Sequence, residues 1–387
     1  MTTLFPAANT VSNPGGRGGA LDVLRFVAAL FVVIFHFGPE APTPLADLHG
    51  FFGRGYMATD FFLLLSGFVL AKAYGKGVVA GKVTLGRFWL KRFARCYPTH
   101  IITLAALVAM VLIATAIGRP PETVGRFPLS GIPDQILLLQ AFGRGGEEWN
   151  VPSWTISTLL ICYAFFPFLW RRFVKIGSPV TALALAVLII LGSDVLTMAA
   201  FGEHQYNLSF KWCFFRALPL FLAGLCVARV VQTANLSAVA ARTTALFGVG
   251  ALLINAFLDG PDAITMLSIM VIVIGCGASP ATRPIPGAEW AAKMSFCLFM
   301  VHTITGAVWY DGVELVQGML APDLATHPLP AWLMWAGGVV FTVIVAGLYH
   351  QFVDDPIQHW IKRNVFDRWQ YPSEKHPAQR QATAPSA

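Results

Sequence analysis

Hydrophobic residues gather along the chain in long runs that short polar segments separate. The runs are about 17–22 residues long, the length a helix needs to cross about 30 Å of hydrocarbon at about 1.5 Å per residue. They lack the alternation of polar and apolar residues that is typical of membrane barrel strands. The pattern predicts an all-α integral membrane bundle of about ten transmembrane helices, near residues 20–37, 58–74, 98–117, 153–170, 180–200, 213–229, 243–258, 263–278, 293–310 and 331–352.

Composition agrees with a membrane protein. Of 387 residues, 56% are hydrophobic and 12% are charged, and the mean hydropathy is +0.63. A soluble domain could not cover its surface with so few charges. The longest segment between runs, 118–152, is too short for an independent enzyme domain of ordinary size. We therefore expect a short N-terminus at 1–19, one membrane domain at 20–365 and a disordered tail at 366–387.

Positive charge is distributed unevenly between alternate connecting segments. One set, which includes both chain ends and residues 75–97, holds 20 of the 27 Lys and Arg residues. Cytoplasmic loops retain positive charge, so both termini are predicted to be cytoplasmic. The opposite set holds Arg54, Arg119, Arg126, Arg144 and Lys211, together with the acidic residues Glu147, Glu148, Asp311, Glu314 and Asp323.

The net charge of +7 requires no nucleic-acid partner. Topology and anionic lipid headgroups account for it, and the sequence contains no motif for binding nucleic acid. The six cysteines form no CxxC pair and have no metal-ligand spacing, so we expect them to pack in the interior and expect no metal site.

The first run, LDVLRFVAALFVVIFHF, carries two residues that are costly in hydrocarbon. Arg25 and His36 are eleven positions apart, close to three helical turns, so they share one face and lie about 16 Å apart along the axis. An ionisable residue within a span is a functional candidate by default. The alternative is that Arg25 reaches lipid phosphates and pairs with Asp22 while His36 lies at the outer interface.

Other polar residues interrupt the apolar runs. Asp60 precedes the Ser66-Gly67-Phe68 turn, and Arg216 lies in CFFRALPLF. Asp60 could form a structural ion pair with Arg25 or Arg216, or it could orient His36. The segment 75–97 contains six basic residues and no acidic residue, a composition suited to phosphate groups or to topology alone. The six are Lys76, Lys82, Arg87, Lys91, Arg92 and Arg95.

Seven segments together resemble the bacterial membrane acyltransferases of the acyltransferase type-three family. They are LDVLRFVAALFVVIFHF, GYMATDFFLLLSGFVL, RFWLKRFARCYP, NVPSWTIS with Tyr163 and Pro167, FFRALPLFLAGL, MSFCLFMVHTIT and YHQFVDDPIQHWIKR, spanning about 20–365. The most specific element is the Arg-to-His pair with ten residues between. The likeness departs at Leu159, where a glutamate is expected, and at Asp355, which replaces the glutamate before the last-span proline.

The resemblance implies a function. It implies an inner-membrane enzyme that moves an acyl group, most simply acetyl, from cytoplasmic acyl-CoA to a hydroxyl of a glycan, a glycan precursor or another acceptor. His36 then matches the catalytic histidine, which acts as the base, and Arg25 its essential partner; Asp60 joins them as a catalytic candidate if it orients His36. Acyl-CoA is a donor substrate and not a bound cofactor, and we expect Arg25, Arg87, Lys91, Arg92 and Arg95 to hold it.

Elementary chemistry supports the same roles. Acyl transfer needs a base that removes the hydroxyl proton, and histidine suits this task near neutral pH. Residues expected to line the acceptor cavity are Ser66, Trp154, Ser157, Arg216 and His302. A transporter or flippase for a lipid-linked or acylated substrate is the alternative, because charged residues in spans also line transport pathways. A purely structural protein would not explain Arg25, Asp60 and Arg216 in apolar spans.

Overall fold

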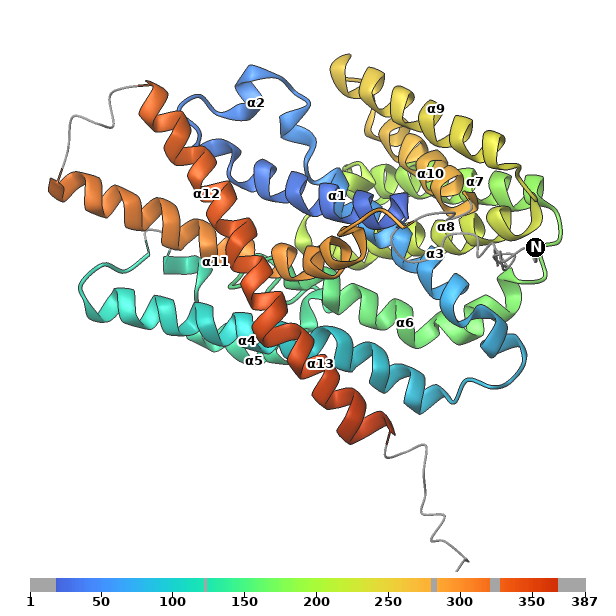
Figure 1. Cartoon of the computed structure of the whole chain (residues 1–387), viewed down its shortest axis with the longest axis horizontal. Coiled ribbons are helices and arrows are strands. Elements are labelled where there is room, and N and C mark those ends of the chain that lie inside the picture. The colour runs from blue at the N-terminus through green and yellow to red at the C-terminus, as the bar shows by residue number, and fades with distance from the viewer. Residues whose placement is uncertain (1–18, 122–123, 280–283, 321–327, 368–387) are drawn as a thin grey trace, which may run out of the picture.

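The computed structural model describes residues 19–121, 124–279, 284–320 and 328–367, and helices account for nearly all of them (Figure 1). Ten long helices occupy the ten predicted positions. They are α1 (Ala20–His36), α3 (Met57–Val79), α4 (Leu85–Ala116), α6 (Ser153–Phe173), α7 (Pro179–Phe201), α8 (Cys213–Thr233), α9 (Ala238–Phe257), α10 (Asp262–Ala278), α11 (Ala288–Leu320) and α12 (Pro328–Tyr349). The described residues contain no strand.

Length and composition identify these helices as membrane spans. Eight of them are long and apolar enough to cross a bilayer, and α1 and α10 have 17 residues each. The predicted all-α polytopic bundle is thus confirmed. Most of the predicted N-terminal segment and tail, and Asp323, lie outside the described residues.

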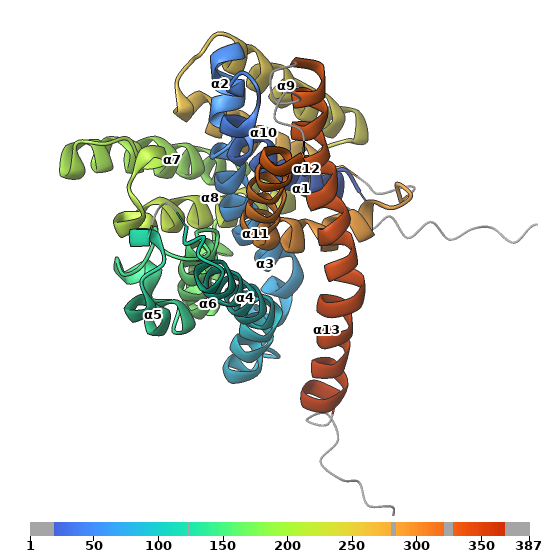
Figure 2. The ribbon, with the colours of Figure 1, turned by 90° about the vertical axis from the view of Figure 1, so that its left-hand side faces the viewer.

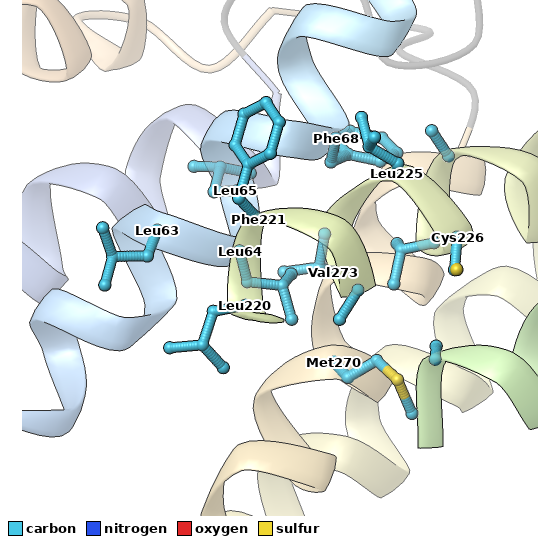
Figure 3. Packing of buried hydrophobic residues seen from close by; sticks show 14 of the residues in the cluster. Leu63, Leu64, Leu65, Phe68, Leu220, Phe221, Leu225, Cys226, Met270 and Val273 are labelled. Atoms are coloured by element: carbon cyan, nitrogen blue, oxygen red, sulfur yellow. The ribbon is translucent and has the colours of Figure 1, made fainter. Parts of the chain in front are cut away.

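The centre of the bundle is a close contact between α3 and α8, with α10 beside them (Figure 3). A Cβ on Gly67 would collide with the Phe221 carbonyl, and one on Gly224 would collide with the Leu64 carbonyl. Two glycines, one from each helix, therefore let the backbones approach, as small residues do in membrane interfaces. Gly67 serves this helix contact.

The basic segment 75–97 is not a loop, contrary to its treatment in the sequence analysis. Residues up to Val79 extend α3 and residues from Leu85 begin α4, so only 80–84 connect them. The stretch RFWLKRFARCYP alternates basic and apolar residues at helical spacing, and long basic side chains cover apolar surface while their charges reach polar surroundings. Pro98 lies inside α4 without ending it.

Two further helical pieces continue α12. A π segment, His350–Asp354, leads directly into α13 (Asp355–Ile361), and a second π segment follows at Lys362–Asp367. Figures 1 and 2 show α12 and α13 as one long rod along the side of the bundle. Short helices, including α2 (Leu45–Leu48) and α5 (Ile132–Ile136), fill the longer connections.

Connections assigned to one side of the membrane contact each other. Arg54 donates to the Gly260 carbonyl, and both belong to the set with few basic residues. Arg229 donates to the Ile176 carbonyl at 2.7 Å and 3.0 Å, and both belong to the basic set. This pairing is what ten alternating spans require.

Candidate active site

His36 is the last residue of α1, and its imidazole is held in one tautomer. Its Nδ1 lies 2.9 Å from the Val32 carbonyl oxygen, one turn earlier. A carbonyl can only accept, so Nδ1 carries the proton and Nε2 keeps a bare lone pair. The side chain is exposed, whereas Val32 and Val33 beside it are buried. His36 therefore presents an accessible proton acceptor.

A second histidine faces the first from α11. The ring centroids of His36 and His302 are 4.8 Å apart, and α1 packs along α11. His302 Nδ1 lies 2.8 Å from the Phe299 carbonyl, so this ring also carries its proton on Nδ1. His302 is fully buried, and its Nε2 has no hydrogen-bond partner within the described part of the chain. A buried acceptor left without a donor costs about 1–3 kcal/mol, which a bound hydroxyl would recover.

The connection between α4 and α6 fastens this end of the site. Asn150, fully buried, donates to Thr103 Oγ1 at 3.1 Å and to the Met300 carbonyl at 3.3 Å. Its Oδ1 accepts from Thr303 at 3.0 Å. Asn150 thus joins α4 to the part of α11 that carries His302. Asn150 opens the segment NVPSWTIS, which carries part of the family resemblance, but a lone asparagine does not predict its hydrogen-bond partners.

Arg25 lies on the same helix as His36, about 16 Å along its axis. Its guanidinium is 3.7 Å from the Asp22 carboxylate, is 35% exposed, and lies close enough to Arg95 and Tyr163 to interact with both electrostatically. Arg95, on α4, is 32% exposed and stacks at 5.1 Å over the Phe296 ring. Two partly accessible guanidinium groups near one another favour an anion between them.

The other basic residues of α4 lie on the helical turns that precede Arg95. Arg92 donates to the Tyr74 hydroxyl at 2.8 Å, Arg87 donates to the Phe366 carbonyl at 3.3 Å, and Lys91 lies 5.5 Å from the Phe366 ring. The buried Nε atoms of Arg87 and Arg92 have no partner among the residues that the structure describes. Arg87 and Arg92 thus each keep one buried donor without a partner among the described residues.

Ser66 lies on the inward part of α3, beside Tyr163 of α6. Its hydroxyl donates to the Phe62 carbonyl at 2.8 Å and interacts with the Tyr163 side chain. Neither contact supplies a base, so the geometry does not favour Ser66 as a nucleophile. Tyr163, which Ser66 contacts, also interacts electrostatically with Arg25, so Ser66 lies near the Arg25 end of α1.

Asp60 and Arg216 form a closed pair. Arg216 Nε and Nη2 each lie 2.8 Å from an oxygen of Asp60, and Nη2 also donates to the Tyr56 carbonyl. The Trp154 ring lies 5.7 Å from the guanidinium carbon. The side chains are 0% and 10% exposed. Of the roles considered for Asp60, the structure provides the ion pair with Arg216, and no described contact links Asp60 to His36.

Three further residues are engaged by protein groups, and of these only Ser157 was expected at the acceptor cavity. Ser157 donates to the Leu138 carbonyl and accepts from the Ala141 amide at 2.9 Å, so it anchors the connection before α6. Leu159, at the position where a glutamate was expected, packs against the main hydrophobic core. Tyr56, the residue before α3, donates to Asp262 at 2.7 Å, and burial together with this hydrogen bond raises the pKa of its hydroxyl.

Sequence reasoning overlooked one acidic residue. Asp354 is 2% exposed and binds Arg95, whereas the neighbouring Asp355, to which the sequence analysis gave the place of the last-span glutamate, lies at the surface near His359. The spacing of His350 and Asp354, four residues apart on one helical face, was the available signal.

Comparison with known proteins gives a family and two relatives. The sequence model of the acyltransferase domain matches residues 19–350. Protein 2 in the picA locus of Rhizobium radiobacter is 41% identical over 112 residues, which are 28% of this chain and 53% of that protein. Acyltransferase MdmB of Streptomyces mycarofaciens is 34% identical over 164 residues, 40% of each chain. The chain thus spans about half or less of the curated relatives it matches. No solved structure matches.

Proposed function

Because the chain belongs to the acyltransferase domain family, whose match covers nearly all of its membrane helices, we propose that it transfers an acyl group from acyl-CoA to an acceptor hydroxyl within this bundle. The family and the name of the Streptomyces relative favour an acyltransferase over the alternative of a transporter. The observation that carries the proposal is the placement of Arg25 and His36 at opposite ends of one face of α1, each with an accessible side chain.

The donor site lies at the Arg25 end. Coenzyme A carries phosphates, and guanidinium groups bind phosphate oxygens in a bidentate way. Arg25 and Arg95 line the accessible space, with Arg87, Lys91 and Arg92 on the adjoining turns of α4. An extended pantetheine arm of about 16 Å would run along α1 past Ser66 and bring the thioester to His36. In this arrangement the protein lies in a bacterial inner membrane. The Arg25 end faces the cytoplasm, and both termini are cytoplasmic.

The acceptor arrives from the His36 end. His36 Nε2 takes the hydroxyl proton as the oxygen attacks the thioester carbonyl, the carbon–sulfur bond breaks, and the proton passes to the leaving thiolate. His302 Nε2 is a second bare acceptor at the same place, suited to a further hydroxyl of a glycan or glycan precursor. Two acceptors side by side favour a carbohydrate over an isolated alcohol, and acetyl is the simplest group to transfer.

Radiolabelled acetyl-CoA tests this function. The purified chain in lipid vesicles is mixed with the label and with envelope glycans extracted from a bacterium. Label that enters the glycan fraction, with release of free thiol, supports acyl transfer. Movement of glycan across the vesicle membrane without label transfer would support a transporter instead.

A further inference from the structure

We propose that Asp354 and Gln358 of the last helical rod are positioning residues that hold Arg95 in the orientation needed to bind the donor's phosphates. The inference rests on the proposed function, which supplies the donor. Asp354 closes the π segment and Gln358 lies in α13, four residues later, so both face α4.

The side chain of Arg95 is held by a buried carboxylate. Its Nη1 lies 2.9 Å from Asp354 Oδ1 and 3.1 Å from Oδ2, and Thr99 donates to Oδ1 at 3.1 Å. His350 Nδ1 lies 3.4 Å from Oδ2. The carboxylate is 2% exposed, while the guanidinium keeps about a third of its surface accessible. One edge of Arg95 is therefore fixed, and its other nitrogens make no hydrogen bond within the described part of the chain, so they can bind a ligand.

The backbone at Arg95 is held as well. Pro98 has no N–H, so the Ala94 carbonyl lacks the hydrogen bond that a helix would normally provide. Gln358 Nε2 donates to this carbonyl at 3.0 Å and to the Arg95 carbonyl at 3.4 Å. A proline in α4 and an amide in α13 thus form one junction, and Arg95 lies at its centre.

The π segment is a second sign of function. Segments of this kind are rare and occur often at functional sites. It places Asp354 in the interior, whereas Asp355, one residue later, lies at the surface 3.3 Å from His359 Nδ1. A helix that only needed to end at the membrane would gain nothing from a buried carboxylate, which is costly to desolvate.

The buried cluster of Cys297, His350 and Asp354 also has the donor set of a metal site, since its ligand atoms lie within 4.8 Å of one another. We assign it to Arg95 instead, because both Asp354 oxygens already accept hydrogen bonds from the guanidinium. A divalent cation there would lie next to a fixed positive charge.

Binding of coenzyme A to the purified full chain tests the proposal. Asp354→Asn should raise the Kd for coenzyme A about tenfold or more. A misplaced binding group can lower affinity by up to about 100-fold. Arg95→Ala should weaken it by at least as much, and the double variant no further than Arg95→Ala, since residues acting through one another are not additive. Asp355→Asn is the matched control and should bind as wild type does.

A phosphate-free probe separates positioning from general damage. S-acetylpantetheine has the thioester arm without the nucleotide phosphates, so its binding should be unchanged in Asp354→Asn. Equal weakening of both probes would mean a merely structural role and would overturn the proposal. So would an unchanged Kd for coenzyme A, or additive effects in the double variant. Stoichiometric zinc in the purified protein, lost in Cys297→Ala, would overturn it in favour of a metal site.

Two milder variants keep the test decisive if Asp354→Asn does not fold. Thr99→Val removes one hydrogen bond to the carboxylate, and Gln358→Met removes those to the α4 backbone, while both leave the ion pair in place. Each should weaken the binding of coenzyme A several-fold while the chain stays folded, and wild-type affinity in both would refute the inference. If the wild-type chain itself binds no coenzyme A, the proposed function fails first, and that result is distinct from any difference between variants.

Discussion

Two ion pairs in the bundle use the same chemical groups in different ways. Asp60 and Arg216 are sealed at the centre, with exposures of 0% and 10%, and the contacts of the arginine go to a carboxylate, a carbonyl and two aromatic rings. Arg95 pairs with an equally buried Asp354 but keeps 32% of its side chain accessible. A charge within a span therefore does not by itself identify a binding residue. What separates the two pairs is the accessible edge that Arg95 keeps after its internal pairing.

The same criterion applies to the histidines. His100 is buried with Nε2 2.9 Å from the Gln135 carbonyl, and it fastens the connection before α6 to α4. In His36 and His302, by contrast, Nδ1 is hydrogen-bonded to a backbone carbonyl and Nε2 is unprotonated, and the two rings lie next to each other. Like His302, His100 has a buried ring nitrogen, Nδ1, without a hydrogen-bond partner among the described residues, and of these three histidines only His36 has an exposed side chain.

The largest effect is expected from removal of the proposed base. His36→Ala should lower kcat for acyl transfer by about 10²–10⁴-fold, the usual contribution of a general base, with little change in thermal unfolding. His359→Ala, which removes a surface histidine of α13, is the control and should retain activity. Transfer at a near wild-type rate in His36→Ala would remove His36 from the mechanism.

Breaking the sealed pair should affect folding more than binding. Asp60→Ala leaves Arg216 buried and uncompensated, so we expect a loss of about 3–5 kcal/mol in stability, seen as a lower Tm. Replacing both residues by apolar ones, Asp60→Leu with Arg216→Met, should recover much of that loss. If Asp60→Ala instead kept the wild-type Tm and lost coenzyme A binding, the contrast between sealed and accessible pairs would be wrong.

A smaller effect is expected at the accessible arginine of α1. Arg25→Lys keeps the charge but loses the planar fork, so the Michaelis constant for acetyl-CoA should rise about tenfold, and Arg25→Ala should raise it further. Equilibrium binding to these variants and to His36→Ala separates the two ends of the helix. Wild-type affinity in the Arg25 variants would refute the lengthwise donor arrangement, and lost donor affinity in His36→Ala would mean that His36 holds the substrate.

The mildest changes assign the two ends of the bundle to sides of the membrane. Single cysteines placed at Arg54 and Arg144, in a chain whose six native cysteines are replaced, should be labelled from outside intact cells by an impermeant thiol reagent, with activity retained. A cysteine at Lys82 should be labelled only after the cells are opened. The reverse pattern would place the donor site on the outer face.

Much of the architecture was predictable because it depends on local properties. The length of each apolar run matches the thickness of the hydrocarbon core of a bilayer, so all ten helix positions follow from hydropathy. The shared face of Arg25 and His36 follows from helical periodicity alone. The limits of α4 did not follow, because basic side chains that cover apolar surface give the same composition as a polar loop.

What the sequence determined by itself is the bundle of membrane helices, the family resemblance and the face of α1 that carries Arg25 and His36. Only the tertiary structure decided that Asp60 belongs to Arg216, that Ser157 fastens a connection, and that Asp354 rather than Asp355 turns inward to Arg95. The reason is physical. Hydropathy and periodicity are properties of neighbouring residues, whereas the partner of a buried charge lies 156 residues away for Asp60 and 259 for Asp354, and only packing brings the two together.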